Sequence, residues 1–133
     1  MNLHKKSGFT LIELLIVIVI LGLLASLVAP AMFSKVDSSK IKTAETQLRM
    51  LESSINTFRL DVGTFPDSLQ ELIKSDKNGW DGPYLPREIP LDPWGNPYVY
   101  AKPGEQGRPY SLRSYGRDGR QGGEGEDADI ILY

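Results

Sequence analysis

The residues best suited to chemistry lie in a glycine-rich acidic segment near the end of the chain. Residues 115–129 contain five carboxylates and five glycines. Ca²⁺ takes about six to eight hard oxygen ligands, and backbone carbonyls that glycine turns aim inward can supply part of them. The spacing does not match the EF-hand loop, which needs acids at alternating positions. These residues alone therefore leave two interpretations open, a calcium site and a solvated acidic loop.

Other chemistry has little support in the sequence. The chain has no cysteine and one histidine, His4, so a disulfide scaffold, thiolate zinc sites, thiol catalysis and His-based catalysis are disfavoured. Asp127 and Asp129 could serve as the acid and base of a membrane-tethered enzyme, but no nucleophile or substrate-cradling motif accompanies them. The net charge of −2 provides no basic footprint for a nucleic acid. We therefore expect neither an enzyme nor a nucleic-acid-binding protein.

Glu13 stands out because of its surroundings, since it is the only ionisable side chain in residues 9–33. As a helix this segment extends about 37 Å, enough to cross a hydrocarbon core of roughly 30 Å. Lys5 and Lys6 precede it, so the positive-inside rule leaves the N-terminus in the cytoplasm and sends residues 34–133 across the membrane. The sequence predicts a single-pass membrane protein.

Two simple interpretations of the apolar segment fit it poorly. The residues Ala29-Pro30-Ala31 imitate the cut site of a secretory signal, but the apolar run is too long for one. A plain membrane anchor leaves Glu13 unexplained, because an acid within a spanning helix costs about 2.5 to 3.5 kcal/mol on insertion scales. A glutamate that snorkels to the membrane surface is the remaining simple alternative.

A third interpretation rests on the stretch KKSGFTLIELLIVIVILGLLA, which begins at Lys5. It closely resembles the N-terminal signature of type IV pilin-like proteins, a basic leader ending in glycine, then phenylalanine, then an apolar helix with glutamate four residues on. The resemblance implies that a prepilin peptidase cleaves between Gly8 and Phe9 and methylates the new N-terminus. The leader is then residues 1–8, and residues 9–33 are kept as the assembly helix.

Cleavage gives Glu13 a physical purpose. It leaves a positive amine on Phe9, one helical turn from the carboxylate, and an unpaired charge among apolar side chains is expensive. A neighbouring subunit shifted by about one turn can set its amine against this carboxylate, which fixes the register more than it adds stability. Pro30 and Gly22 should weaken the helix between them, and the resemblance implies that this stretch loses helicity on assembly.

Residues 34–133 are expected to form a periplasmic head of α+β class. An apolar stripe at helical spacing predicts that the membrane helix continues, as an amphipathic half, to about residue 60. Its members are Ile41, Ala44, Leu48, Leu51, Ile55 and Phe58. The helix should end within residues 61–66, where glycine and proline occur. A short helix should follow, with a capping box of Ser68 and Glu71.

The rest of the head should be a small antiparallel sheet joined by structured loops. Five prolines between residues 78 and 100 preclude a long helix. Residues 92–97 read as a turn that Trp94 anchors to the core. Strands are expected at residues 98–102, 110–114 and 130–133.

This second half sharpens the resemblance. The stretches GPYL and PLDPWGNPYVY, with the acidic tail after them, look like the major pseudopilins of type II secretion systems. Many true pilins close this region with a disulfide. The absence of cysteine from this chain therefore argues against a true pilin. The resemblance implies a calcium site with side-chain ligands Asp118 and either Asp127 or Asp129, and with the Tyr115 carbonyl. We expect the remaining glutamates, Glu124 and Glu126, to face solvent.

The resemblance also implies a function and a location. The protein would be the major structural subunit of the pseudopilus, a homopolymeric periplasmic filament that drives folded exoproteins through the outer-membrane secretin. Its other partners would be the prepilin peptidase, minor pseudopilins and the inner-membrane assembly platform, and it would reside in the bacterial inner membrane before assembly. A type IV pilin or competence-type pilin, used for adhesion, motility or DNA uptake, is the alternative.

Overall fold

One long helix runs through both compact units of the chain, residues 1–36 and 37–133. The computed structural model describes residues 8–132, so most of the predicted leader lies outside the described residues. Helix α1 spans Leu11–Val62 and continues through Pro30. The weakening expected between Gly22 and Pro30 does not interrupt α1 in the single chain, because flanking turns keep their hydrogen bonds around one missing donor. Loss of helicity on assembly stays a prediction.

In the second unit the predicted apolar stripe of α1 forms the core. Ala44, Leu48, Leu51, Ile55 and Phe58 are fully buried or nearly so, whereas Ile41 at the start of the stripe is half-buried. Side chains at this spacing lie on one face, so that face packs while the charged faces stay in water. The core cluster is completed by Leu69, Leu72, Leu85, Tyr98, Tyr110 and Leu112.

The end of α1 follows from Gly63. Its φ of 92° is left-handed, and its N–H bonds to the Arg59 carbonyl at 2.8 Å. The short helix that follows is the 3₁₀-helix η1, Leu69–Leu72. The predicted capping box is wrong, because Ser68 makes no side-chain cap and Glu71 accepts a hydrogen bond from the Asp67 N–H at 2.8 Å instead.

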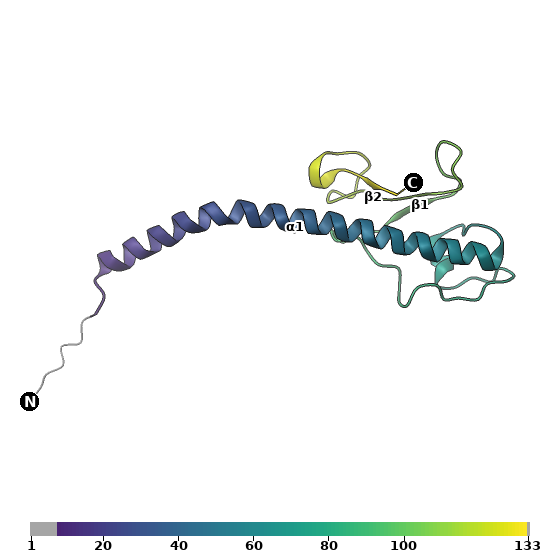
Figure 1. Cartoon of the computed structure of the whole chain (residues 1–133), viewed down its shortest axis with the longest axis horizontal. Coiled ribbons are helices and arrows are strands. Elements are labelled where there is room, and N and C mark those ends of the chain that lie inside the picture. The colour runs from purple at the N-terminus through teal and green to yellow at the C-terminus, as the bar shows by residue number, and fades with distance from the viewer. Residues whose placement is uncertain (1–7, 133) are drawn as a thin grey trace, which may run out of the picture. The chain divides into compact units, whose positions relative to one another are not determined.

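The predicted antiparallel sheet is confirmed, with strands shorter than expected. Its order is β1-β2-β3, with β1 at Val99–Ala101, β2 at Ser111–Ser114 and β3 at Ile130–Ile131. Tyr100 lies opposite Leu112, and Ser114 lies opposite Ile130. A second 3₁₀-helix, η2 at Gly125–Asp127, directly precedes β3. Figure 1 shows the sheet and the yellow acidic loop on one side of the C-terminal half of α1.

The aromatic loop between η1 and β1 is fastened to helices by its polar ring atoms. The Trp80 ring N–H bonds to the Glu71 carbonyl at 2.7 Å, and the Tyr84 hydroxyl bonds to Asp61 at 2.8 Å. The Tyr98 hydroxyl reaches Gln47 of α1. Each of these three rings is buried at least in part and keeps a partner for its polar group, which explains a structured loop without regular elements. The predicted anchor Trp94 is half-buried and stands outside the core cluster of the described residues.

Candidate functional site

The first functional region is the apolar half of α1. The large apolar side chains from Phe9 to Leu24 are each half exposed or more. In the described part of the chain α1 is the one helix long and apolar enough to cross a membrane. Water is a poor solvent for such a surface, so these side chains require lipid or other apolar helices around them.

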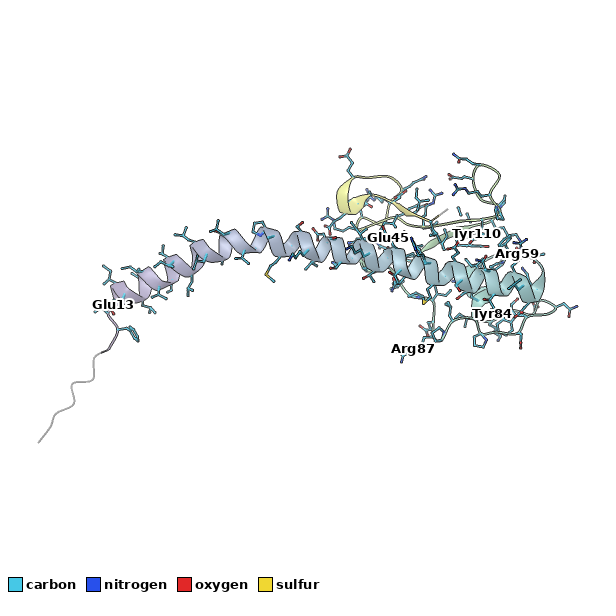
Figure 2. The ribbon with its side chains drawn as sticks, viewed as in Figure 1. Glu13, Glu45, Arg59, Tyr84, Arg87 and Tyr110 are labelled. Carbon is cyan, nitrogen blue, oxygen red and sulfur yellow. The ribbon has the colours of Figure 1, made fainter. Side chains whose placement is uncertain are left out.

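Glu13 lies at the beginning of this helix (Figure 2). Its N–H donates to the Thr10 hydroxyl at 3.2 Å, and its carboxylate accepts from the Thr10 N–H at 3.4 Å. This reciprocal pair is a capping box, and it satisfies two backbone donors that a helix start leaves free. Sequence reasoning missed it, although the Thr-x-x-Glu spacing immediately before the apolar run carries the signal. In a single subunit Glu13 therefore has a partner within its own chain.

The second candidate region is the acidic loop, residues 115–129, whose start is supported by a buried carboxylate. Asp92 is only 4% exposed and starts the turn over residues 92–97. One of its oxygens accepts hydrogen bonds from the N–H groups of Trp94 at 3.1 Å and Asn96 at 2.8 Å. Its other oxygen accepts from the Ser114 hydroxyl at 2.8 Å. A carboxylate with three donors is well satisfied despite its burial, so the turn has a fixed shape.

The turn over residues 92–97 in turn fixes the start of the acidic loop. The Asn96 side-chain amide donates to the Gly116 carbonyl at 3.1 Å. The Ser114 hydroxyl accepts from the Gly116 N–H at 3.2 Å. A Cβ at Gly116 would lie 2.7 Å from the carbonyl oxygens of Glu126 and Ala128, and its φ is 78°. Glycine at this position lets the two ends of the loop approach closely.

The loop closes on itself through Arg117. Its N–H donates to the Glu126 carbonyl at 2.9 Å. Its guanidinium grips both oxygens of Asp127, with Nε at 3.0 Å and Nη2 at 3.2 Å, and Nη1 bonds to Glu126 at 2.8 Å. The hydrogen bond and charge of Asp127 raise the pKa of Arg117 above its ordinary value.

Glu126 also lies beside a carboxylate of α1. Hydrogen bonding with Asp37 is the main cause that raises the pKa of Glu126, and Arg117 opposes it by attraction. The Glu126 side chain is 17% exposed, so the expectation that it faces solvent is wrong. The reason is the closure of the loop against α1. Glu124 is exposed, as expected.

The structure places the predicted calcium ligands Asp118, Asp127, Asp129 and Tyr115 in one loop, and each of the three carboxylates has a protein partner. Asp118 accepts from the Arg120 N–H at 3.1 Å, Asp129 accepts from the Gly122 N–H at 3.0 Å, and Asp127 is held by Arg117. No group of three acidic, histidine or cysteine side chains with metal-binding geometry occurs in residues 8–132. The donor chemistry fits a hard cation such as Ca²⁺, but Arg117 occupies one of the carboxylates. Sequence reasoning gave no signal for this pairing.

Comparison with known proteins decides the family. The family model described as type II secretion system (T2SS), protein G, matches residues 31–133. The chain belongs to the type II secretion system protein G family. A prokaryotic N-terminal methylation motif also matches residues 3–29, which include Gly8, Phe9 and Glu13.

Individual relatives cover nearly the whole chain. A type II secretion system core protein G of Pseudomonas aeruginosa is 38% identical over 98% of this chain and 96% of that protein. One from Vibrio cholerae is 37% identical over 97% of this chain and 92% of its own length. The crystal structure of the major pseudopilin from the type 2 secretion system of enterohaemorrhagic Escherichia coli has a TM-score of 0.60 and is 27% identical. It covers 75% of this chain and 91% of its own.

Membership in the protein G family confirms the resemblance seen in the sequence. The long helix and small antiparallel sheet are the pseudopilin fold. The protein G family is a structural pseudopilin family, and the chain is a major pseudopilin of type II secretion. The type IV or competence-type pilin alternative is not favoured by these matches.

Proposed function

We propose that this chain is processed between Gly8 and Phe9, N-methylated on Phe9, and then polymerised through residues 9–33 into a periplasmic filament. The apolar half of α1 carries the proposal. Its side chains are exposed along a full membrane-spanning length and need neighbours. Helices of other subunits provide those neighbours after assembly, while lipid provides them before.

In this proposal Glu13 exchanges its partner on assembly. Before assembly it caps its own helix through Thr10. In the filament it meets the Phe9 amine of the next subunit, and a misplaced neighbour leaves both charges among apolar side chains. The pairing therefore selects one axial stagger.

The remaining partners follow from type II secretion. Lys5 and Lys6 support a cytoplasmic N-terminus and, with it, a periplasmic head. The prepilin peptidase processes the subunit, and the inner-membrane platform extends the filament with minor pseudopilins. The growing filament drives folded exoproteins through the outer-membrane secretin. The subunit contributes packing and transfers no chemical group.

Mass spectrometry of the mature N-terminus tests the processing step. We expect a chain that begins at methylated Phe9. A mature chain that begins beyond Ala31 would show that the apolar helix is discarded, and the filament proposal would fail. Deletion of the protein should abolish exoprotein release while twitching and transformation continue, which separates this function from those of type IV and competence-type pilins.

We further propose that the acidic loop binds calcium through the carboxylates of Asp118 and of Asp127 or Asp129, with the Tyr115 carbonyl as a further ligand. Three features support it. The donors are hard oxygens, glycine permits the close loop, and the turn over residues 92–97 fixes the loop at its start. The cation would offset the repulsion among five acids and the entropy cost of ordering a loop rich in glycine.

A further inference from the structure

Of the two carboxylates proposed as the second calcium ligand, Asp127 is held by Arg117, whereas Asp129 accepts from the Gly122 N–H. With Asp127 as the ligand, Arg117 and the calcium ion require the same carboxylate. The guanidinium donates to both oxygens of Asp127, and it donates to Glu126 in the same fork. This bidentate arrangement is the strongest that arginine makes with a carboxylate. A calcium ligand must offer a free lone pair to the ion, and two cations on one carboxylate repel each other.

We propose that Arg117 is a resident counter-cation of the acidic loop, which holds Asp127 when calcium is scarce and is displaced from it when calcium binds. The inference rests on the proposed calcium site. By this inference Arg117 has two opposing effects on the loop. Arg117 stabilises the loop without the ion, and it lowers the affinity of the loop for the ion.

The surroundings of Arg117 allow such an exchange. Its side chain is 58% exposed, while Asp127 and Glu126 are 31% and 17% exposed. The guanidinium can therefore swing into water while the carboxylates stay in place. Its backbone N–H remains bonded to the Glu126 carbonyl, so release of the side chain leaves the loop closed.

The negative charges around Asp127 and Glu126 favour a state in which one cation, either the guanidinium or calcium, is always bound to them. Asp37 of α1 adds a third carboxylate beside Glu126, and Lys40 is the other cation whose charge acts on Glu126. Loss of Arg117 from Asp127 without a replacement would leave these acids facing one another. A divalent ion more than replaces the charge that Arg117 withdraws.

Arg120 provides a matched control within the same loop. It carries the same charge three residues along, and its backbone N–H, not its guanidinium, contacts Asp118. Among the described residues no ion pair joins its guanidinium to a carboxylate. Replacement of Arg120 by glutamine thus changes the charge of the loop equally without freeing Asp127.

The test uses the full mature chain in detergent. Calcium affinity is measured by titration calorimetry, and the melting temperature is measured in chelator and in saturating calcium. We expect Arg117→Gln to bind calcium about threefold to tenfold more tightly than Arg120→Gln, and to melt lower than Arg120→Gln in chelator only. Arg117→Lys keeps the charge without the fork, so its affinity should lie between wild type and Arg117→Gln.

The outcomes separate this inference from the calcium site itself. If Arg117→Gln and Arg117→Lys bind calcium with the affinity of wild type, the site stands and the role of Arg117 is overturned. If neither wild type nor Arg117→Gln binds calcium, both proposals fail. Binding by Arg117→Gln alone would support the inference in its strongest form. Asp127→Asn should bind more weakly than wild type, and its retention of full affinity would refute the shared carboxylate.

Discussion

The carboxylate of Asp92 accepts a hydrogen bond from the hydroxyl of Ser114 at 2.8 Å in the interior of the head. This contact joins the turn before β1 to the last residue of β2, which is where the acidic loop begins. The same hydroxyl accepts from Gly116, so one buried carboxylate fixes both the turn and the entry to the loop. The acidic loop is therefore joined to the core at its start through Asp92 and Ser114.

Replacement of Asp92 by alanine should destabilise the head strongly. The change leaves the N–H groups of Trp94 and Asn96 and the Ser114 hydroxyl without their acceptor. We expect a loss of about 2 to 4 kcal/mol in the free energy of unfolding, measured by urea denaturation of the full chain in detergent. The exposed Asp76 serves as the control, and Asp76→Ala should stay within about 0.5 kcal/mol of wild type. Equal stability of the two variants would contradict the anchoring role of Asp92.

Glu13→Leu should give a protein that inserts into the membrane but assembles poorly. Filament abundance, measured by shearing and immunoblot, should fall by roughly tenfold or more, since wrong staggers are no longer penalised. Glu13→Gln separates charge from helix capping, because glutamine retains the capping box with Thr10 but cannot form an ion pair with an amine. We expect it to assemble as poorly as Glu13→Leu. Normal filaments from Glu13→Gln would show that the charge does not set the register.

Calcium should raise the melting temperature of the head by at least about 5 °C, since an ion at a hundred times its Kd adds about 2.7 kcal/mol. Asp118→Ala should remove this increment. Glu124→Ala is the control, because that side chain is exposed and stands outside the proposed ligand set. Identical melting curves of wild type in chelator and in millimolar calcium would dismiss the site.

Asp67 should contribute to the loss of stability in acid. Hydrogen bonds from Lys77 and Lys102, with their charges, hold the pKa of Asp67 below its ordinary value of 3.8. A carboxyl whose pKa is lowered by folding stabilises the native state above its unfolded pKa, and this contribution disappears as the pH falls through the folded pKa. Asp67→Asn should therefore flatten the decline of melting temperature between about pH 5 and pH 2. The effect should be small, because the side chain is 66% exposed. A decline as steep as that of wild type would contradict it.

Local patterns in the sequence predicted the long elements and the processing motif. The stripe from Ala44 to Phe58 repeats at the helical period, so its burial follows from the sequence alone. Gly8, Phe9 and Glu13 stand against an apolar background that makes their spacing conspicuous. Gly63 with Pro66 likewise marked the end of the helix.

Contacts between distant residues could not be predicted in this way. The hydrogen bonds from Ser114 to Asp92 and from Asn96 to Gly116 join residues about twenty positions apart, and they depend on how the turn docks on the sheet. The choice of Asp127 by Arg117 depends on the closure of the loop, because four other acids lie within the same short segment. Such choices are made by tertiary packing rather than by local propensity.

The exposed apolar half of α1 has a consequence for the reversibility of the polymer. Moving that surface from lipid to a bundle of like helices removes no further water, so the transfer itself has little hydrophobic driving force. The free energy of a subunit's apolar helix is thus similar in lipid and in the bundle, and a modest mechanical force can shift the subunit from one to the other. For the proposed filament we therefore expect that subunits return to the bilayer when the force that extends it ceases.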